Sequence, residues 1–167
     1  ARKGDSMKLL VLSDSHGDMA SLRLAVQRER PDAVLHLGDH ALDAYTLAQE
    51  FSTMSIAYVR GNCDISFPSC AETYLRRLAG VQVFAAHGHR YGVKSGLLRF
   101  HYAAQENGAA LALFGHTHTP YCRQEDGLWL VNPGACSGWR ATYAVVMLDR
   151  GAVLDCRIRE VYQEETL

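Results

Sequence analysis

The sequence predicts a layered α/β fold, a four-layer αββα sandwich built as a single domain. Three observations support this prediction. Short apolar runs alternate with helical patterns in the first half of the chain, and strand-like runs follow one another closely in the second half. The length of 167 residues suits one domain.

The first half of the chain is predicted to form three strands separated by two helices. Strand-like apolar runs occupy residues 7–14, 33–39 and 55–64. Apolar residues at helical spacing follow the first run as far as Pro31, and a second helical pattern occupies residues 41–51. Alternation of this kind indicates βαβ units and a parallel sheet.

The second half is richer in predicted strands. After a loop at 65–71, residues 73–88 indicate two strands, and residues 95–107 indicate a helix that Gly108 closes. Further strands are expected at 109–116, 128–134, 142–149 and 152–161.

Composition and charge limit the classes of function. The residues are 48% hydrophobic and 21% charged, which is typical of a globular protein. Because the net charge is −1, we expect no strong nucleic-acid binding and no membrane partner, so any phosphate affinity must be local. Five cysteines without a CxxC pair favour reduced thiols in the cytoplasm.

The first six residues, ARKGDS, are polar and differ in character from the apolar run that follows. They lack the apolar core of a signal peptide. We expect residues 1–6 to be an expression remnant outside the fold, and the domain to span residues 7–167.

Polar residues collect where the predicted strands end. Because the carboxyl ends of strands in an α/β sheet meet at one edge, we expect these residues to line one pocket. Their glycine neighbours allow sharp turns, and carboxylate, amide and imidazole groups suit Mn, Fe, Zn, Ni or Co ions. The groups are DSH from Asp14, GD from Gly38, GNCD from Gly61, HGH from His87 and GHTH from Gly115.

The GHTH group contains two histidines two residues apart. In an extended segment this spacing places both imidazoles on the same side of the chain. We therefore expect His116 and His118 to be two ligands of one pocket.

In this order, each after a predicted strand, the five motifs resemble those of the calcineurin-like metallophosphoesterase superfamily. Within it they resemble the small single-domain branch of YfcE-type phosphodiesterases, which is related to the Vps29 scaffold proteins. The resemblance extends from Met7 to about Val161. It implies two divalent metal ions, with manganese expected first and nickel, zinc, iron or cobalt as alternatives. The seven implied ligands are Asp14, His16, Asp39, Asn62, His87, His116 and His118.

The resemblance also divides the ligands between the two ions and implies a reaction. The implied activity is hydrolysis of a small phosphate diester by a metal-bound hydroxide, held between two cations on the order of 3.5–4 Å apart. One ion is held by Asp14, His16 and His118, the other by Asn62, His87 and His116, and Asp39 bridges both.

The group that protonates the leaving oxygen stays open. The wider superfamily often has a histidine where this chain has Cys63, so His89 and Asp64 are the candidate general acids. Asn62 is neutral and is expected to contact metal or phosphate without repelling the substrate. His40 and Cys63 are candidates for substrate contact.

Several polar residues have structural interpretations. His36 lies within a predicted strand and is expected to pack in the core, and the VNPGACS segment at 131–137 is expected to be a structural turn. Arg60 and Arg140 could meet a phosphate, but nothing in the sequence distinguishes them from surface positions.

Two other functions compete with the phosphodiesterase. One is a Vps29-like protein-binding scaffold with a vestigial or structural metal site, and the other is a dinuclear hydrolase of a different bond, such as an amide. The complete ligand set favours the enzyme acting on a small phosphate ester. A homo-oligomer is compatible with the resemblance.

Overall fold

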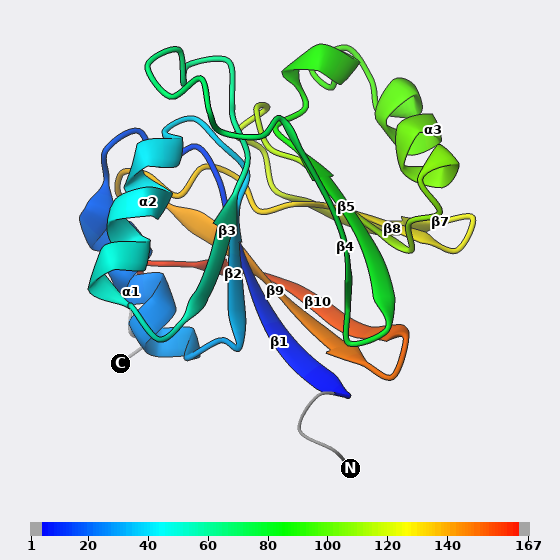
Figure 1. Cartoon of the computed structure of the whole chain (residues 1–167), viewed down its shortest axis with the longest axis horizontal. Coiled ribbons are helices and arrows are strands. Elements are labelled where there is room, and N and C mark those ends of the chain that lie inside the picture. The colour runs from blue at the N-terminus through cyan, green and yellow to red at the C-terminus, as the bar shows by residue number, and fades with distance from the viewer. Residues whose placement is uncertain (1–4, 164–167) are drawn as a thin grey trace.

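The computed structural model describes residues 5–163 and consists of two β-sheets packed face to face, each with helices on its outer face (Figure 1). This arrangement confirms the predicted α/β sandwich.

The first sheet has five strands in the order β10-β9-β1-β2-β3. Strands β1, β2 and β3 are parallel, as the alternating pattern predicts, whereas β9 runs antiparallel to both of its neighbours. The strands are β1 (Ser6–Leu12), β2 (Ala33–His36), β3 (Ser55–Tyr58), β9 (Thr142–Asp149) and β10 (Ala152–Glu160).

The second sheet also has five strands, in the order β4-β5-β6-β8-β7. Its central strands β5, β6 and β8 are parallel, and the edge strands β4 and β7 are antiparallel to their neighbours. The sequence does not predict β7, because its residues YCRQE are mostly polar and partly exposed at a sheet edge. The strands are β4 (Thr73–Leu78), β5 (Val81–Ala86), β6 (Leu111–Leu113), β7 (Tyr121–Glu125) and β8 (Leu128–Asn132).

The α-helices form the two outer layers. Helices α1 (Met19–Glu29) and α2 (Ala41–Glu50) cover the first sheet, and α3 (Leu98–Glu106) covers the second (Figure 1). Asp18 caps α1 by accepting a hydrogen bond from the Ser21 N–H at 3.1 Å. A short 3₁₀ helix, η1 (His89–Tyr91), lies between β5 and α3.

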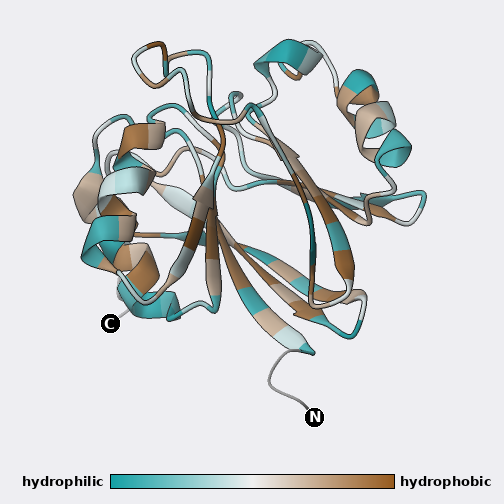
Figure 2. Ribbon diagram, viewed as in Figure 1, coloured by the Kyte–Doolittle hydropathy of each residue, from teal (hydrophilic) through white to brown (hydrophobic). Residues whose placement is uncertain are grey.

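Alternation along the strands produces the layers, because successive side chains point to opposite faces of a sheet. In β1, Leu9 and Val11 enter the core between the sheets, whereas Leu10 and Leu12 pack with Leu22 of α1. A third apolar cluster joins the second sheet to α3. Figure 2 shows long hydrophobic stretches on the strands of both sheets.

Several strands end earlier than predicted. The runs predicted to end at residues 14, 39, 64, 116 and 134 end at Leu12, His36, Tyr58, Leu113 and Asn132. The residues left out include the glycines and polar residues of the motifs, which form turns instead. Apolar patterning alone does not separate the last residue of a strand from the first residue of the loop.

The fold also begins earlier than predicted. Ser6 is the first residue of β1 and pairs with Asp149 of β9, so the expectation that residues 1–6 lie outside the fold is wrong for Ser6. Residues 1–4 lie outside the described part of the chain.

Candidate metal centre

Six of the predicted ligands lie in two adjoining groups at the carboxyl ends of the strands. The first cluster consists of Asp14, His16 and His118, and the second of Asp39, His87 and His116; in each, the potential ligand atoms lie within 4.8 Å of one another. The clusters adjoin because His87 Nε2 lies 3.2 Å from Asp39 Oδ2 and 3.9 Å from Asp14 Oδ1.

The backbone at these residues has an uncommon conformation. Five of the six have positive φ, the left-handed region that costs a residue other than glycine about 1–3 kcal/mol. Such turns aim neighbouring side chains at a shared centre, and unfavourable conformations of this kind gather at functional sites. The angles are 51° at Asp14, 45° at His16, 47° at Asp39, 69° at His116 and 61° at His118.

The GHTH segment is therefore not extended, and the geometry predicted for its two histidines is wrong. His116 joins Asp39 and His87 in the second cluster, whereas His118 joins Asp14 in the first. The two-residue spacing serves two adjoining groups, because left-handed turns at both histidines replace the extended path.

Glycines surround the carboxylates for two different reasons. Gly38 has φ of 98°, so it does make the sharp turn that the sequence suggests. At Gly61, a Cβ atom would collide with the Asp39 carboxylate, and at Gly115 it would collide with the Ser13 hydroxyl and lie 2.7 Å from Asp14 Oδ2. These two positions need glycine because the Asp39 carboxylate at Gly61, and the Ser13 hydroxyl with the Asp14 carboxylate at Gly115, occupy the space of a side chain.

Asp14 is completely buried, and its two oxygens differ. Oδ2 accepts hydrogen bonds from the Ser13 hydroxyl and from the His116 N–H at 3.1 Å. Oδ1 accepts no hydrogen bond from the described residues, although His118 Nε2 and His87 Nε2 lie within ion-pair distance at 3.1 Å and 3.9 Å. A buried oxygen that accepts no hydrogen bond is unfavourable. A cation bound by Asp14 and His118 would satisfy it. The first cluster therefore fits a metal ion.

His87 is oriented as a ligand by the main chain. Its Nδ1 lies 2.8 Å from the Leu37 carbonyl, so Nδ1 donates a hydrogen bond and Nε2 faces the cluster. Nε2 lies 3.2 Å from both Asp39 Oδ2 and His116 Nδ1. Burial acts to lower the pKa of His87, but Asp39 and Asp14 outweigh it and raise that pKa. A metal ion bound here would replace the proton on Nε2.

The pKa shifts of the other two members of the second cluster favour the protonation states that bind metal ions. Burial acts to raise the pKa of Asp39, but hydrogen bonds from His87 and from the Cys63 N–H at 2.9 Å hold it well below its usual range. Burial and the neighbouring His87 lower the pKa of His116, which favours the neutral imidazole that binds metals.

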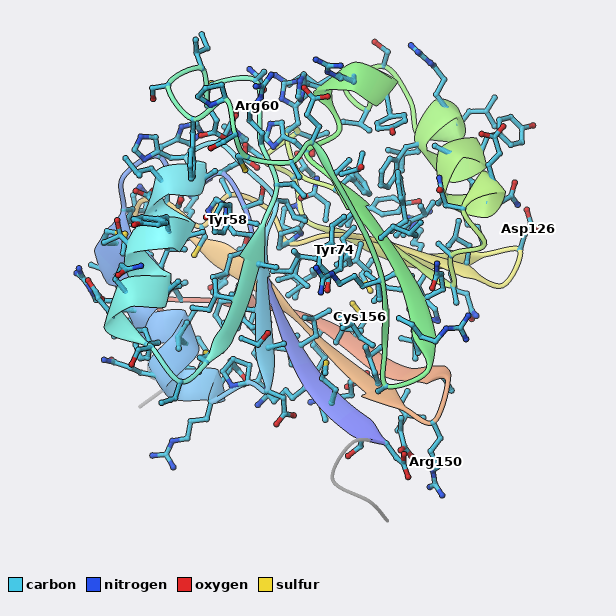
Figure 3. All side chains as sticks on the ribbon, viewed as in Figure 1. Tyr58, Arg60, Tyr74, Asp126, Arg150 and Cys156 are labelled. Carbon is cyan, nitrogen blue, oxygen red and sulfur yellow. The ribbon has the colours of Figure 1, made fainter. Side chains whose placement is uncertain are left out.

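The predicted ligand Asn62 is exposed and lies beside the second cluster. It lines a cleft of about 280 Å³ with Arg60, Asp64 and His89. The ring centroid of His89 lies 5.4 Å from that of His87. In Figure 3, Arg60 lies at the upper edge of the molecule among the polar side chains of the loops. Asn62 and His89 thus line one cleft, next to the second cluster.

The surroundings of Asp64, a candidate general acid, are those of a residue that holds loops in place. The Asp64 carboxylate is buried and accepts hydrogen bonds from three main-chain N–H groups, those of Asp39 at 2.9 Å, Gly61 at 2.7 Å and Ala41 at 2.8 Å. Both oxygens are occupied as acceptors, so Asp64 fixes the loops that follow β2 and β3.

The two candidates for substrate contact lie at the edge of the site. His40 is the N-cap residue that precedes α2. Its ring is half exposed, and its Nδ1 lies 2.9 Å from Asp43 Oδ1. Cys63 is exposed. Partial loss of contact with water and the nearby Asp39 carboxylate nevertheless raise the pKa of its thiol, which therefore stays protonated. Its main-chain N–H is the group that contacts Asp39.

A buried polar network below the first cluster is not evident from the sequence. His36 is buried as predicted, and burial lowers its pKa to about 4, so the ring is neutral. It accepts from the Gly38 N–H at 3.1 Å and donates to Ser15 Oγ at 2.9 Å, and Ser15 donates to Asp43 Oδ2 at 2.7 Å. Asp43 also accepts from the Gly17 N–H at 2.7 Å. This network ties the loops after β1 and β2 to α2.

Asn132 ties together two further loops of the site, those that follow β6 and β8. Its amide donates to the Gly115 carbonyl at 3.1 Å and to Thr117 Oγ1 at 2.9 Å, and its oxygen accepts from the Gly134 N–H at 2.8 Å. The predicted turn at 131–137 thus supports the GHTH loop.

Comparison with known proteins identifies the family. The model of the calcineurin-like phosphoesterase superfamily domain matches residues 7–151. The probable metallophosphoesterase YsnB of Bacillus subtilis is 32% identical over 152 residues, covering 87% of each chain. The phosphodiesterase YfcE of Escherichia coli is 28% identical over 155 residues, covering 78% of this chain and 80% of YfcE. The chain therefore belongs to the calcineurin-like phosphoesterase superfamily.

Solved structures agree with this assignment. A Streptococcus pneumoniae protein described as a predicted phosphoesterase superposes with a TM-score of 0.79 at 29% identity, covering 93% of this chain and 90% of that one. Vps29 of Cryptosporidium parvum superposes with a TM-score of 0.74 at 14% identity, covering 93% and 97%, which shows the same fold. The predicted resemblance to this family is confirmed, and the chain is a phosphoesterase by family. Within residues 5–163, no helix is long and apolar enough to span a membrane.

Proposed function

We propose that this chain is a metal-dependent phosphodiesterase that hydrolyses small phosphate diesters at a centre for two divalent cations. The observation that carries the proposal is the fully buried Asp14, one oxygen of which accepts no hydrogen bond from the described residues and faces His118. The relatives named as phosphodiesterases, such as YfcE, support the class of substrate.

Each cluster would hold one cation, and Asp39 would contact both. Asn62 would complete the second site. The donors are carboxylate, amide and imidazole groups without a thiolate, which suits manganese and also nickel, zinc, iron or cobalt. When bound, such cations lower the pKa of a water molecule and neutralise phosphoryl oxygens.

The chain's own residues bind and orient the substrate in this proposal. Asn62 and the residues around it receive the phosphate in the cleft next to the second cluster. Asn62 adds no negative charge there. His89 lines the same cleft and is the candidate that remains for donating a proton to the leaving oxygen.

We also place the protein in the cytoplasm. All five cysteines are free thiols, which a reducing compartment maintains. Because the net charge is −1, the overall field does not attract an anion, so the affinity for the proposed small phosphate ester comes from the local site.

The test is hydrolysis of bis-p-nitrophenyl phosphate by protein that has been treated with chelator, with and without added Mn²⁺. We expect turnover only with metal and its loss in Asp39→Asn. Asp155→Asn removes a half-exposed carboxylate on β10 and is the matched control. Absence of turnover with Mn²⁺, Ni²⁺ and Zn²⁺ would contradict the proposal and favour the scaffold function. Cleavage of a matched amide in place of the diester would favour the third function.

A further inference from the structure

A groove of about 1090 Å³ opens beside the first cluster. His118 lines this groove and also belongs to the cluster, so the groove begins where the proposed metal centre ends. Its walls include Trp139, Arg140, Glu160 and Tyr162. The volume is sufficient for an organic group of nucleotide size.

Trp139 is a large aromatic side chain that lines this groove. It is 76% exposed, which is unusual for so large an aromatic residue. The guanidinium carbon of Arg140 lies 4.4 Å from the centroid of the indole ring. Together the two side chains form a planar aromatic and cationic surface beside His118.

The charge of Arg140 is available to a ligand. Within residues 5–163, Arg140 takes part in no ion pair, whereas Arg60, the other arginine considered for phosphate contact, is paired with Glu72 at 3.1 Å. The structure therefore distinguishes two arginines that the sequence does not.

The loop that carries these residues is fixed relative to the metal ligands. The Cys136 N–H donates to the carbonyl of Ser13, which precedes Asp14, at 2.8 Å. The Gly138 N–H donates to the Asp18 carboxylate at 2.9 Å. A surface that is already held in position loses little conformational freedom when a ligand binds.

We propose that Trp139 and Arg140 form a subsite for the planar aromatic arm, a nucleobase or aryl group, of the phosphodiester substrate. This inference rests on the proposed function, because the phosphate of the same substrate would lie at the metal centre. An aromatic ring and a guanidinium group both stack on planar bases, and the positive charge favours an anionic ligand. An alkyl arm would gain neither interaction.

The first test compares two competitive inhibitors of bis-p-nitrophenyl phosphate hydrolysis. Thymidine 5′-monophosphate carries a base, whereas ribose 5-phosphate carries a similar sugar phosphate without one. We expect Trp139→Ala to raise the inhibition constant of the thymidine nucleotide about tenfold and that of the sugar phosphate less than about twofold. Arg140→Ala should act in the same direction. Tyr102→Ala, which removes a 56% exposed aromatic residue from α3, is the matched control.

An equal rise for both inhibitors, or no rise for either, would overturn the subsite. A second readout does not need turnover. In Trp129→Phe, Trp139 is the only tryptophan, and the nucleotide but not the sugar phosphate should quench its fluorescence saturably. If the wild-type protein hydrolyses no diester, the proposed function fails, and this titration alone decides the subsite. Absence of saturable quenching would then overturn it.

Discussion

Two buried carboxylates of this chain have opposite surroundings. Glu29, at the end of α1, is 6% exposed, and both of its oxygens are paired. Lys8 Nζ lies 2.8 Å from Oε2, and the Tyr143 hydroxyl and Arg159 lie 2.7 Å and 3.2 Å from Oε1. Asp14 is buried more completely, but its Oδ1 accepts no hydrogen bond from the described residues, and the groups nearest to it are the imidazoles of His118 at 3.1 Å and His87 at 3.9 Å.

The difference is the one expected between a carboxylate that stabilises the fold and one that binds a metal ion, the role proposed for Asp14. Burial acts to raise the pKa of Glu29, but hydrogen bonds from Lys8 and Tyr143 outweigh it and lower that pKa. Glu29 also has helical backbone, whereas Asp14 has the left-handed φ of 51°. A left-handed backbone and a buried oxygen that accepts no hydrogen bond from the described residues are the two features on which the proposed role of Asp14 as a metal ligand rests.

The largest expected effect is on activity. Asp14→Asn should lower kcat for bis-p-nitrophenyl phosphate more than about 100-fold. Loss of a residue that only orients a metal ligand costs about 10- to 100-fold, and loss of a ligand itself should cost more. The free energy of unfolding of the metal-free variant should change by less than about 1 kcal/mol, because the unpaired oxygen contributes no hydrogen bond. Steady-state kinetics and urea unfolding measure the two quantities. A large loss of metal-free stability would make Asp14 a structural residue like Glu29.

Asp64 should behave as a structural residue although it lies in the motif GNCD. Asp64→Asn places an NH₂ group against main-chain N–H donors and should lower the free energy of unfolding by about 2–3 kcal/mol. Urea unfolding of the metal-free protein tests this. Unchanged stability together with lost turnover would instead return Asp64 to the role of general acid.

Glu29→Gln should show the reverse of Asp14→Asn. At pH 7 it should lower the free energy of unfolding by about 1–2 kcal/mol, since Lys8 and Arg159 are partly exposed and screened. Its turnover with Mn²⁺ should match the wild type, because no site residue contacts Glu29.

The same variant has a defined pH dependence. Because the folded pKa of Glu29 lies below its unfolded value of about 4.3, its stabilisation is complete above that value and is lost as the pH falls through the folded pKa. Urea unfolding across this range should show the stability gap closing in acid. A gap that stays constant would contradict the assignment to the Glu29 charge.

The smallest effect should come from an exposed pair. Arg157 Nε lies 2.7 Å from the Asp155 carboxylate, and the two side chains are 65% and 45% exposed. Asp155→Asn should change the free energy of unfolding by no more than about 0.5 kcal/mol, because water screens the charges. A loss as large as that of Glu29→Gln would show that burial does not separate these ion pairs.

The sequence predicts the layers well because alternation is a local property. In β1, Leu9 and Leu10 face different cores, as their positions require. It also predicts which residues gather at the strand ends, because each motif follows an apolar run.

The rest depends on non-local contacts. The left-handed turns at His116 and His118, the three N–H donors around Asp64 and the Asp43 network arise only when several loops meet. Trp139 gives no signal in the sequence, since its exposure and its place beside His118 depend on the loop after β8.

The central claim is that the two clusters around Asp14 and Asp39 are arranged to bind cations. Titration calorimetry of chelator-treated protein with Mn²⁺ tests it most directly, with Glu29→Gln and Asp14→Asn measured in parallel. The account predicts two Mn²⁺ per chain for the wild type and Glu29→Gln, and loss of one in Asp14→Asn. A wild type that binds no Mn²⁺, or an Asp14→Asn variant that binds it as the wild type does, would contradict the account.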